Sequence, residues 1–537
     1  MKKYSYHITV AGILLLVIFL RFFHISTLPL GMHIDEAGLG LNAWSLANYG
    51  TDRYGNFMPV CPSNFYGEQS AFYTYFCALL VKLRGLNMYT LRLPGVIMGL
   101  LSVWFGALLI REKWGKRGFL TGLILMGIFP YFIMNSRFAL DCNAMLGALT
   151  VSLYALVRLL KKAEHHPGQR LYGHFALTGI LFGITLYTYI IAALVISVFC
   201  ILFGLYYLFY QKDGRSLRFR QLLFLALPLC IMAVPLILVV CVNYFDLEPV
   251  VTPFFSIPKM AENRTAEVSL SLSAIAGKLK NLIYPLTSDG KYGSSDRYWT
   301  MYPWSVGFVA VGAVCSLQQA WKSFRSNTLS TDFLILSLSF AEVLMFLLCG
   351  YYNYHINGIF IALAWFCVNG IFFFRKLFRK PSLRTVYAGI LIALYGTSFA
   401  GFIREYYFSD TSVAFQLYNG VYEAVSLLTP DQRTQEIYVL DEVGEFYFLS
   451  APLSPKVFAA NCNELGYVQD YENLHFHEPA QYEGTYIYIC NKHSGWYGSL
   501  SGKDFSGYSC NVKETGHYYI IWFTPTDSTG RSLVPFR

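Results

Sequence analysis

Long apolar runs dominate the sequence, and they constrain the fold more than any other feature. A helix needs about 20 apolar residues to cross the hydrocarbon of a membrane, and about eleven runs approach that length. They centre on 8–27, 93–110, 118–134, 139–159, 172–187, 189–209, 221–242, 303–319, 331–349, 357–374 and 385–403. Only 14% of the residues are charged, against roughly 25% in an average soluble protein. We therefore expect a multi-pass membrane protein.

Lysine and arginine gather in every second connection between these runs. Cytoplasmic connections keep positive charge during membrane insertion, so this pattern predicts a cytoplasmic N-terminus. The basic groups are Lys2 and Lys3; Arg111, Lys113, Lys116 and Arg117; Arg158, Lys161, Lys162 and Arg170; Lys212, Arg215, Arg218 and Arg220; Lys322 and Arg325; Arg375, Lys376, Arg379, Lys380 and Arg384. The formal net charge is +9. Because the basic residues cluster in short connections between apolar runs, we take this charge to reflect membrane topology and expect no nucleic-acid partner.

The opposite side of the membrane then carries two long loops, at 28–92 and 243–302, and a C-terminal tail. We expect a mainly α membrane domain at 1–403 and a separate extracytoplasmic domain at 404–537, where the composition becomes that of a soluble protein. Strand-like runs at 436–440, 486–490 and 518–524 predict that this domain is α/β or mainly β. Within the second loop, the composition predicts a lid with a helix at 270–282.

The first outer loop begins with two adjacent carboxylates, Asp35 and Glu36, close to the first apolar run. Charge beside lipid is costly, so such a pair indicates a water-filled site. At a helix start Asp35 would accept backbone N–H groups and stay ionised, and an ionised carboxylate can take a proton from a hydroxyl. In the alternative interpretation, Asp35 only caps the helix and Glu36 is solvated in its first turn.

The rest of this loop is predicted to fold back onto the membrane surface. A polar turn at 50–56 is followed by an aromatic amphipathic stretch at 72–83, which ends in Lys82 and Arg84. Amphipathic helices of this kind lie along the membrane interface.

These features together resemble the GT-C glycosyltransferases of the protein O-mannosyltransferase and lipid A aminoarabinose transferase type (glycosyltransferase family 39). The resemblance rests on the order of an N-terminal anchor, an acidic pair in the form His-x-Asp-Glu-Ala, an interfacial helix and a new span. The motifs that carry it are His33 to Ala37, Leu91-Arg92-Leu93-Pro94, Asn135 to Asp141, Leu186-Tyr187-Thr188-Tyr189 and Tyr354-His355-Ile356-Asn357. It covers about 400 residues in topology.

The resemblance implies an inverting transfer of a sugar from a polyprenyl-phosphate donor in the membrane lipid to an acceptor on the outer face. The acceptor would be an envelope polymer, a lipid or a protein. Asp35 is the candidate general base, with Glu36 beside it, and the donor phosphate would be bound by Arg137, Tyr354 and His355. For Arg137, snorkelling to the membrane interface is the alternative. Further site candidates are His33, Asp141 and Tyr189.

A divalent metal ion is a possible cofactor. Glu68 matches an acidic position that ligates such a metal in the aminoarabinose branch of this superfamily. The chain departs from that branch, because Gln69 follows where the branch has lysine and residues 243–302 contain no histidine. It also has Gly38-Leu39-Gly40 where the branch carries an arginine. Metal dependence therefore stays open.

A polytopic transporter of a lipid-linked or small polar substrate is the main alternative, and an inactive accessory subunit is another. Transporters tend to have paired repeats and broken helices at the middle of the bilayer. The polar residues of this chain lie instead at the predicted outer edge, and its two halves show no clear repeat. From the C-terminal sequence, which carries no eukaryotic retention signal, we expect a bacterial plasma membrane.

Overall fold

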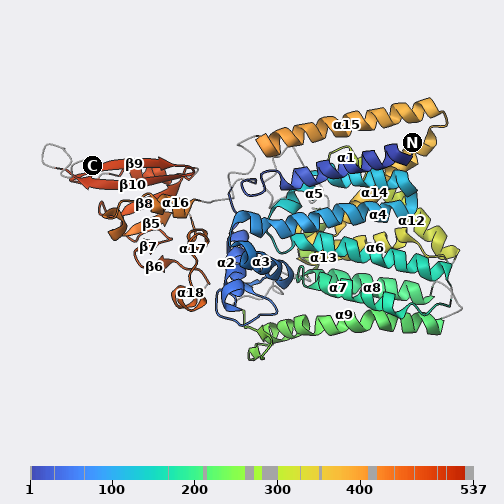
Figure 1. Ribbon diagram of the computed structural model, residues 1–537, viewed down its shortest axis with the longest axis horizontal. Helices are drawn as coiled ribbons and strands as arrows, with labels where there is room; N and C mark the ends of the chain where they lie inside the picture. Colours follow the sequence, from blue (N-terminus) through green and yellow to red (C-terminus); the bar gives the residue numbers. More distant parts are fainter. Residues whose placement is uncertain are drawn as a thin grey trace.

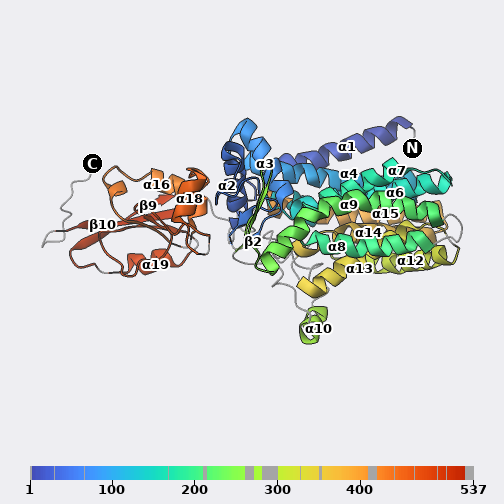
Figure 2. The ribbon, with the colours of Figure 1, turned by 90° about the horizontal axis from the view of Figure 1, so that it is seen from below.

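The computed structural model describes residues 3–526 apart from 30, 66, 167, 210–214, 261–270, 281–299, 327, 350–352, 409–419, 441, 465, 493 and 504. The described residues form a bundle of long helices and a smaller β-sheet unit (Figure 1). Helices α2 (Ile34–Tyr49) and α3 (Ala71–Arg84) lie at one end of the bundle, between it and the sheet unit (Figures 1 and 2). The fold is therefore mainly helical, with a small C-terminal sheet.

The long helices of the bundle run side by side (Figure 1). In chain order they are α1 (Lys3–Phe22), α4 (Met88–Ile128), α6 (Asn143–His165), α7 (Tyr172–Leu186), α8 (Ala192–Phe209), α9 (Arg215–Tyr244), α12 (Ser305–Arg325), α13 (Thr331–Cys349), α14 (Ile359–Leu377) and α15 (Pro381–Phe408). Short helical segments are α5 (Pro130–Met134), η1 (Asn135–Arg137) and η3 (Asn353–Ile356). Within the described ranges, eight helices are long and apolar enough to cross a membrane, and α7 and α12 are not among them.

Helix α4 contains two of the predicted runs, because the chain reverses direction at Gly115. This residue has φ of 62° and ψ of −151°, a conformation that glycine adopts readily and other residues rarely. After the reversal, Gly122 lies against Ala107 and Ile110 of the first arm. The run at 93–110 and residues 118–128 of the next run therefore pack against each other as two arms of α4, and the rest of that second run continues into α5. The total of about eleven spans stays a prediction.

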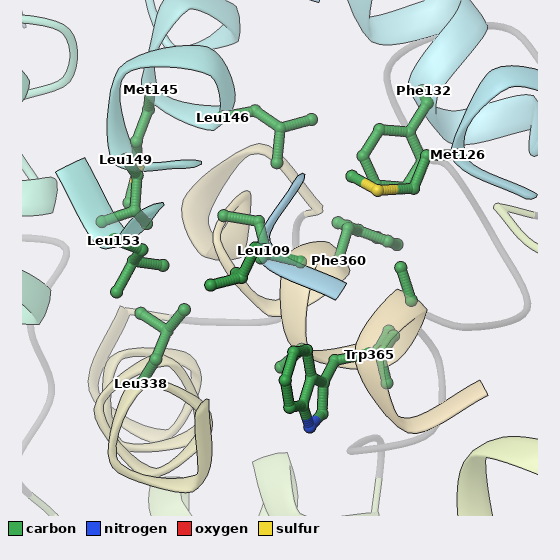
Figure 3. Packing of buried hydrophobic residues seen from close by; sticks show 14 of the residues in the cluster. Leu109, Met126, Phe132, Met145, Leu146, Leu149, Leu153, Leu338, Phe360 and Trp365 are labelled. Atoms are coloured by element: carbon green, nitrogen blue, oxygen red, sulfur yellow. The ribbon is translucent and has the colours of Figure 1, made fainter. Parts of the chain in front are cut away.

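The core of the bundle is made of large apolar side chains from several helices. Figure 3 shows Leu109 and Met126 of the two α4 arms together with Leu146 of α6 and with Phe360 and Trp365 of α14. All five are almost fully buried. Inside a membrane such contacts stabilise the bundle by close packing, since lipid is as apolar as the side chains.

A buried polar centre joins four helices at the end of the bundle where basic residues gather. Asp332 of α13 accepts hydrogen bonds from Lys113 Nζ at 2.7 Å, Ser316 Oγ at 2.8 Å and Trp365 Nε1 at 2.9 Å, and Asn369 Nδ2 adds a fourth at 3.2 Å. These donors come from α4, α12 and α14. A carboxylate buried in this way is stabilised only while its donors remain.

The segment 28–92, which is expected to lie on the outer side and is called the first outer loop below, contains α2, α3 and a two-stranded sheet of β1 (Ser63–Asn64) and β2 (Gly67–Glu68). The amphipathic stretch predicted at 72–83 is helical, as α3, and it exposes Leu79 and Leu83. In the segment expected to form the second outer loop, β3 (Val250–Val251) pairs with β4 (Ser256–Ile257). Helix α10 (Leu272–Lys280) lies at the margin of the bundle (Figure 2), where Lys278 Nζ donates to the carbonyl of Leu348 in α13 at 2.7 Å. The helix predicted at 270–282 is confirmed at 272–280, and its two ends lie outside the described residues.

The C-terminal unit is a six-stranded sheet in the order β6-β7-β5-β8-β10-β9. Strand β5 is parallel to β7 and β8, and the other pairs are antiparallel. The strands are β5 (Ile437–Leu440), β6 (Asp470–Tyr471), β7 (Leu474–His475), β8 (Ile487–Asn491), β9 (Tyr508–Thr515) and β10 (Tyr518–Pro525). Its helices are α16 (Val421–Ser426), η4 (Gln432–Thr434), α17 (Gly444–Phe448), α18 (Pro455–Asn461) and α19 (Trp496–Ser501). The three predicted strands correspond to β5, β8 and β10.

The sheet unit contacts the first outer loop through a buried cation. Arg53 donates hydrogen bonds to Asn64 Oδ1 at 3.1 Å and to the Tyr54 hydroxyl at 2.8 Å. Its guanidinium lies over the rings of Phe65 and of Phe458 from α18. Glu445 of α17 lies 4.0 Å from Arg53, and neither of its carboxylate oxygens has a hydrogen-bond partner among the described residues. Burial raises the pKa of Glu445 to about 7, although Arg53 opposes the shift.

We expect Asp332→Ala to destabilise the bundle by roughly 3–5 kcal/mol, because removing one partner of a buried ion pair leaves the other charge uncompensated. Thermal unfolding in detergent measures the loss. The matched control is Asp246→Asn, which removes an exposed ion pair with Lys259. Asparagine tolerates the positive φ of 53° at this position, so the unfolding temperature should stay unchanged. Equal effects of the two substitutions would contradict a structural role for Asp332.

We expect the contact between the sheet unit and the first loop to weaken as the pH rises from about 5 to about 8. A carboxyl group whose pKa is higher in the folded state than in the unfolded state binds extra protons when folded, so its stabilisation falls as the pH passes through that window. Thermal unfolding over this pH range should show a smaller slope for Glu445→Gln than for wild type. The control is Glu423→Gln on α16, at an exposed residue; identical slopes for wild type and Glu445→Gln would rule out this assignment.

Candidate active site

Helix α2 begins with the predicted acidic pair, held in a capping box. His33 is the N-cap residue. Its ring nitrogen Nδ1 accepts a hydrogen bond from the backbone N–H of Asp35 at 3.1 Å, and the backbone N–H of His33 donates to Glu36 Oε2 at 3.1 Å. The side chain of Asp35 is 33% exposed, and its Oδ2 lies 3.4 Å from His33 Nδ1. The positive end of the helix favours an ionised carboxylate at this position.

Glu36 has a different environment from its neighbour, because its side chain is fully buried. Arg92, in the first turns of α4, donates to both oxygens of Glu36 at 3.0 and 3.1 Å, and the backbone N–H of Ala139 donates at 2.7 Å. The other N–H groups of Arg92 bind carbonyl oxygens that follow α1, those of Ile25 at 3.2 Å, Pro29 at 3.2 Å and Gly31 at 3.0 Å. Glu36 therefore fixes the start of α2 to the bundle, and it is not solvated as in the alternative interpretation.

Arg137 is also fully buried, and it holds the end of α1. Its terminal nitrogens donate to four backbone carbonyls, those of Leu20 at 2.8 Å, Arg21 at 3.1 Å, Phe23 at 2.7 Å and Leu28 at 3.0 Å. The last carbonyls of a helix have no partner within the helix, so these bonds satisfy them. The phosphate contact predicted for Arg137 would require exchange of these bonds, and it stays a prediction.

Asp141 lies where three parts of the chain meet. Its Oδ2 accepts the backbone N–H of Ser70 at 2.8 Å, and Ser70 Oγ in turn accepts the N–H of Ile190 at 3.1 Å. Ser70 is two residues beyond Glu68, and Ile190 follows Tyr189. Asp141, Glu68 and Tyr189 are thus brought into one neighbourhood, in which Glu68 and Tyr189 are buried.

A network of amides joins this neighbourhood to η3. Asn357 Oδ1 accepts hydrogen bonds from the Tyr131 hydroxyl and from Asn135 Nδ2, and its Nδ2 donates to the carbonyl of Cys142 at 2.8 Å. Asn135 also donates to Asn143 Oδ1 at 3.0 Å. The predicted phosphate ligand His355 lies in η3, two residues before Asn357, and is buried. The side chain of the second predicted ligand, Tyr354, lies outside the described part of the structure.

The segment 135–143 takes part in contacts with several of these elements. It carries Arg137, which holds α1; Ala139, which donates to Glu36; and Asp141, which holds the start of α3 through Ser70. Six of the predicted residues form two groups, His33 with Asp35 and Glu36, and Glu68 with Asp141 and Tyr189. The segment 135–143 supplies Asp141 to the second group and contacts the first through Ala139.

The sequence reasoning missed the roles of Arg92 and Asn357. In the sequence Arg92 is part of the motif Leu91-Arg92-Leu93-Pro94 at the start of a span. An arginine in an apolar helix indicates a buried acidic partner. That signal points to a carboxylate of the first outer loop. No comparable signal exists for Asn357, since its described partners are a hydroxyl, a side-chain amide and a backbone carbonyl from distant segments.

No metal centre is apparent at Glu68 in the described residues. The one group of three potential ligands whose donor atoms lie within 4.8 Å of one another consists, among the described residues, of Asp470, His475 and His477 in the C-terminal sheet. The metal ligation predicted for Glu68 stays a prediction.

Comparison with known proteins supports the predicted fold. Residues 68–242 match the family described as dolichyl-phosphate-mannose-protein mannosyltransferase. A search of curated proteins finds no match. The family match covers less than half of the chain, and it includes α3, both arms of α4 and the segment 135–143.

Two solved structures resemble nearly the whole chain. ArnT from Cupriavidus metallidurans bound to undecaprenyl phosphate has a TM-score of 0.54 and 12% identity, over 97% of this chain and 98% of its own. The archaeal oligosaccharyltransferase AglB from Archaeoglobus fulgidus, in complex with an inhibitory peptide and a dolichol-phosphate, has a TM-score of 0.53 and 13% identity, over 98% of this chain and 77% of its own. The chain thus has the fold of the GT-C glycosyltransferases, as its sequence resemblance predicted.

We expect Glu36→Gln to destabilise the first outer loop by roughly 3–5 kcal/mol, because the buried Arg92 would lose its only described carboxylate partner. Asp35→Asn is the matched control: it changes the neighbouring, partly exposed carboxylate and should cost less than about 1 kcal/mol. Limited proteolysis between α2 and α3, together with thermal unfolding, measures both. If the two variants are equally stable, the Glu36–Arg92 pair does not hold this loop.

Proposed function

We propose that the chain is a membrane glycosyltransferase that moves a sugar from a polyprenyl-phosphate donor to an acceptor on the extracytoplasmic face. The observation that carries the proposal is the GT-C fold together with a partly exposed carboxylate, Asp35, at the start of α2. In support, the two similar structures hold undecaprenyl phosphate and dolichol-phosphate, which are polyprenyl phosphates. The acceptor would be an envelope polymer, a lipid or a protein.

The proposed orientation has a cytoplasmic N-terminus and an extracytoplasmic sheet unit, in a bacterial plasma membrane. It is supported by the distribution of basic residues at one end of the bundle. Arg158, Lys161 and Lys162 line a cavity of about 700 Å³ there, with Glu112 and His174. The acidic pair belongs to the loop at the opposite end (Figure 1). Positive charge is retained on the cytoplasmic side.

The reaction we propose is a single displacement with inversion. The acceptor oxygen attacks the anomeric carbon, the bond from that carbon to the phosphate oxygen breaks, and the phosphate leaves with the electron pair. Asp35 takes the acceptor's proton as general base. This role suits a carboxylate that reaches solvent and is kept ionised by a helix N-terminus. Glu36 could reach the acceptor only by breaking its hydrogen bonds with Arg92. We therefore assign Glu36 a positioning role, in which it holds the helix start that carries Asp35.

The remaining residues are assigned to binding and support. His355 and Tyr354 are the proposed contacts for the donor phosphate, since imidazole and phenol groups donate hydrogen bonds to phosphate oxygens. His33 orients Asp35 through the capping box. Asp141 and Tyr189 would line the site beside α3. Arg137 would support the site by holding the end of α1. Its contact with the donor phosphate remains part of the proposal.

Wild-type protein in lipid nanodiscs should consume one donor from a panel of radiolabelled polyprenyl-phosphate sugars when a crude envelope acceptor is present. Label should move from the organic phase to the acceptor, because the sugar leaves its lipid carrier. If no donor is consumed while a soluble sugar or ion shifts the unfolding temperature, the transporter interpretation replaces this proposal.

Asp35→Asn should lower the turnover number by roughly 10²–10⁴-fold, the usual contribution of a general base, while donor affinity stays close to that of wild type. The amide keeps the size of the side chain and cannot accept the proton. Asp35→Glu, which keeps a carboxylate, should retain part of the activity. Full turnover by Asp35→Asn would remove Asp35 from the reaction.

A further inference from the structure

Three potential ligands converge at one edge of the C-terminal sheet. Asp470 of β6 is the cross-strand partner of His475 of β7. Its Oδ1 lies 2.6 Å from His475 Nδ1 and 2.8 Å from His477 Nε2. The two histidines are two residues apart, and both of their rings reach the same carboxylate oxygen. The cluster belongs to the sheet unit and is separate from the acidic pair of the first outer loop.

In each histidine ring one nitrogen, the inner one, faces Asp470, and the other, the outer one, faces away from it. The outer nitrogen is held by a group that can only accept a hydrogen bond. His475 Nε2 lies 2.6 Å from Glu436 Oε2, and His477 Nδ1 lies 2.8 Å from the backbone carbonyl of Glu478. Each outer nitrogen must therefore carry the hydrogen. In a neutral imidazole the inner nitrogen is then an acceptor. Two nitrogen lone pairs and one carboxylate oxygen face one another, and such a group of acceptors is stable only with positive charge between them.

The rings are also held by packing. His475 stacks on Tyr438 of β5, with ring centroids 4.5 Å apart and an interplanar angle of 21°, and His477 meets the same ring edge-on at 5.9 Å. Metal-binding histidines characteristically donate their second N–H to a carboxylate or a backbone carbonyl, which sets the tautomer and the ring orientation. Both forms of that support are present here, in Glu436 and in the Glu478 carbonyl.

We propose that Asp470, His475 and His477 form a binding site for a divalent cation of the zinc class. Imidazole nitrogen and carboxylate oxygen are ligands that zinc accepts in a tetrahedral arrangement. Ligand atoms around zinc lie about 3.3 Å apart, as follows from bond lengths of about 2.0–2.1 Å, so small side-chain rotations suffice to admit the ion. The fourth position faces solvent, because the Asp470 side chain is 60% exposed.

Such an ion would join β6, β7 and the segment that follows β7, and through Glu436 it would also support β5. These strands form one edge of the sheet, where short strands have few hydrogen bonds of their own. The site is independent of the transfer reaction proposed above, and a chain without transferase activity would still bind the metal.

The test uses the full chain in nanodiscs, purified without a histidine tag and stripped with a chelator. Zinc ion alone is titrated, and bound metal is counted by mass spectrometry. We expect one high-affinity zinc ion per chain and a higher unfolding temperature of the sheet unit. The double variant His475→Ala/His477→Ala should lose this ion, whereas His517→Ala, at an exposed histidine of the same unit, should keep it.

A milder variant guards against loss of folding. Glu436→Gln leaves all three ligands in place and should weaken zinc binding about 10–100-fold, as expected for a group that orients a metal ligand. Unchanged secondary structure by circular dichroism verifies that the variant is folded. If wild type binds no stoichiometric zinc, the proposal is wrong and protons hold the cluster together. If the double variant binds zinc as tightly as wild type, the ion is bound elsewhere and the proposal is likewise wrong. Unweakened binding by Glu436→Gln would contradict the support assigned to Glu436.

Discussion

Four hydrogen bonds converge on the buried carboxylate of Glu36, two from Arg92 and one each from the backbone of Ala139 and His33. They join the first outer loop to α4, to the segment 135–143 and to its own helix start. The acceptors of Arg92 extend the same contact to the chain after α1. A fully buried charge pair is stable only when all its donors and acceptors are satisfied, so these elements depend on one another.

This arrangement gives two adjacent carboxylates opposite properties. Glu36 is buried and fully bonded, while Asp35, one residue earlier, reaches solvent at the positive end of α2. A reacting carboxylate requires a fixed position and access to the acceptor, and a single side chain seldom combines burial with exposure. The proposed chemistry therefore separates the two requirements, with Glu36 and Arg92 holding the helix start and Asp35 available for the proton. The sheet unit adds a second support, through Arg53, to the same loop.

The sequence was sufficient to predict the apolar helices, the helical stretch at 72–83, three strands of the C-terminal sheet and the GT-C fold. The helices and strands follow from local patterns, namely runs of about 20 apolar residues and alternating strands. The GT-C fold was expected from the resemblance of several motifs to that superfamily, and not from these patterns. The partners of single charged residues were not predictable in this way. Arg92 lies 56 residues from Glu36, and the carbonyls that Arg137 binds lie more than 100 residues away. The support that Arg137 gives to the end of α1 was therefore not predictable from its neighbours in the sequence, and its contact with the donor phosphate stays a prediction.

In the proposed mechanism the sugar is transferred in one displacement, with Asp35 as the base. The most direct measurement is the anomeric configuration of the first transfer product, determined by nuclear magnetic resonance and compared with that of the polyprenyl-phosphate donor. A single displacement assisted by one carboxylate predicts inversion. A product with retained configuration would require a covalent sugar–enzyme intermediate and would contradict the role assigned to Asp35.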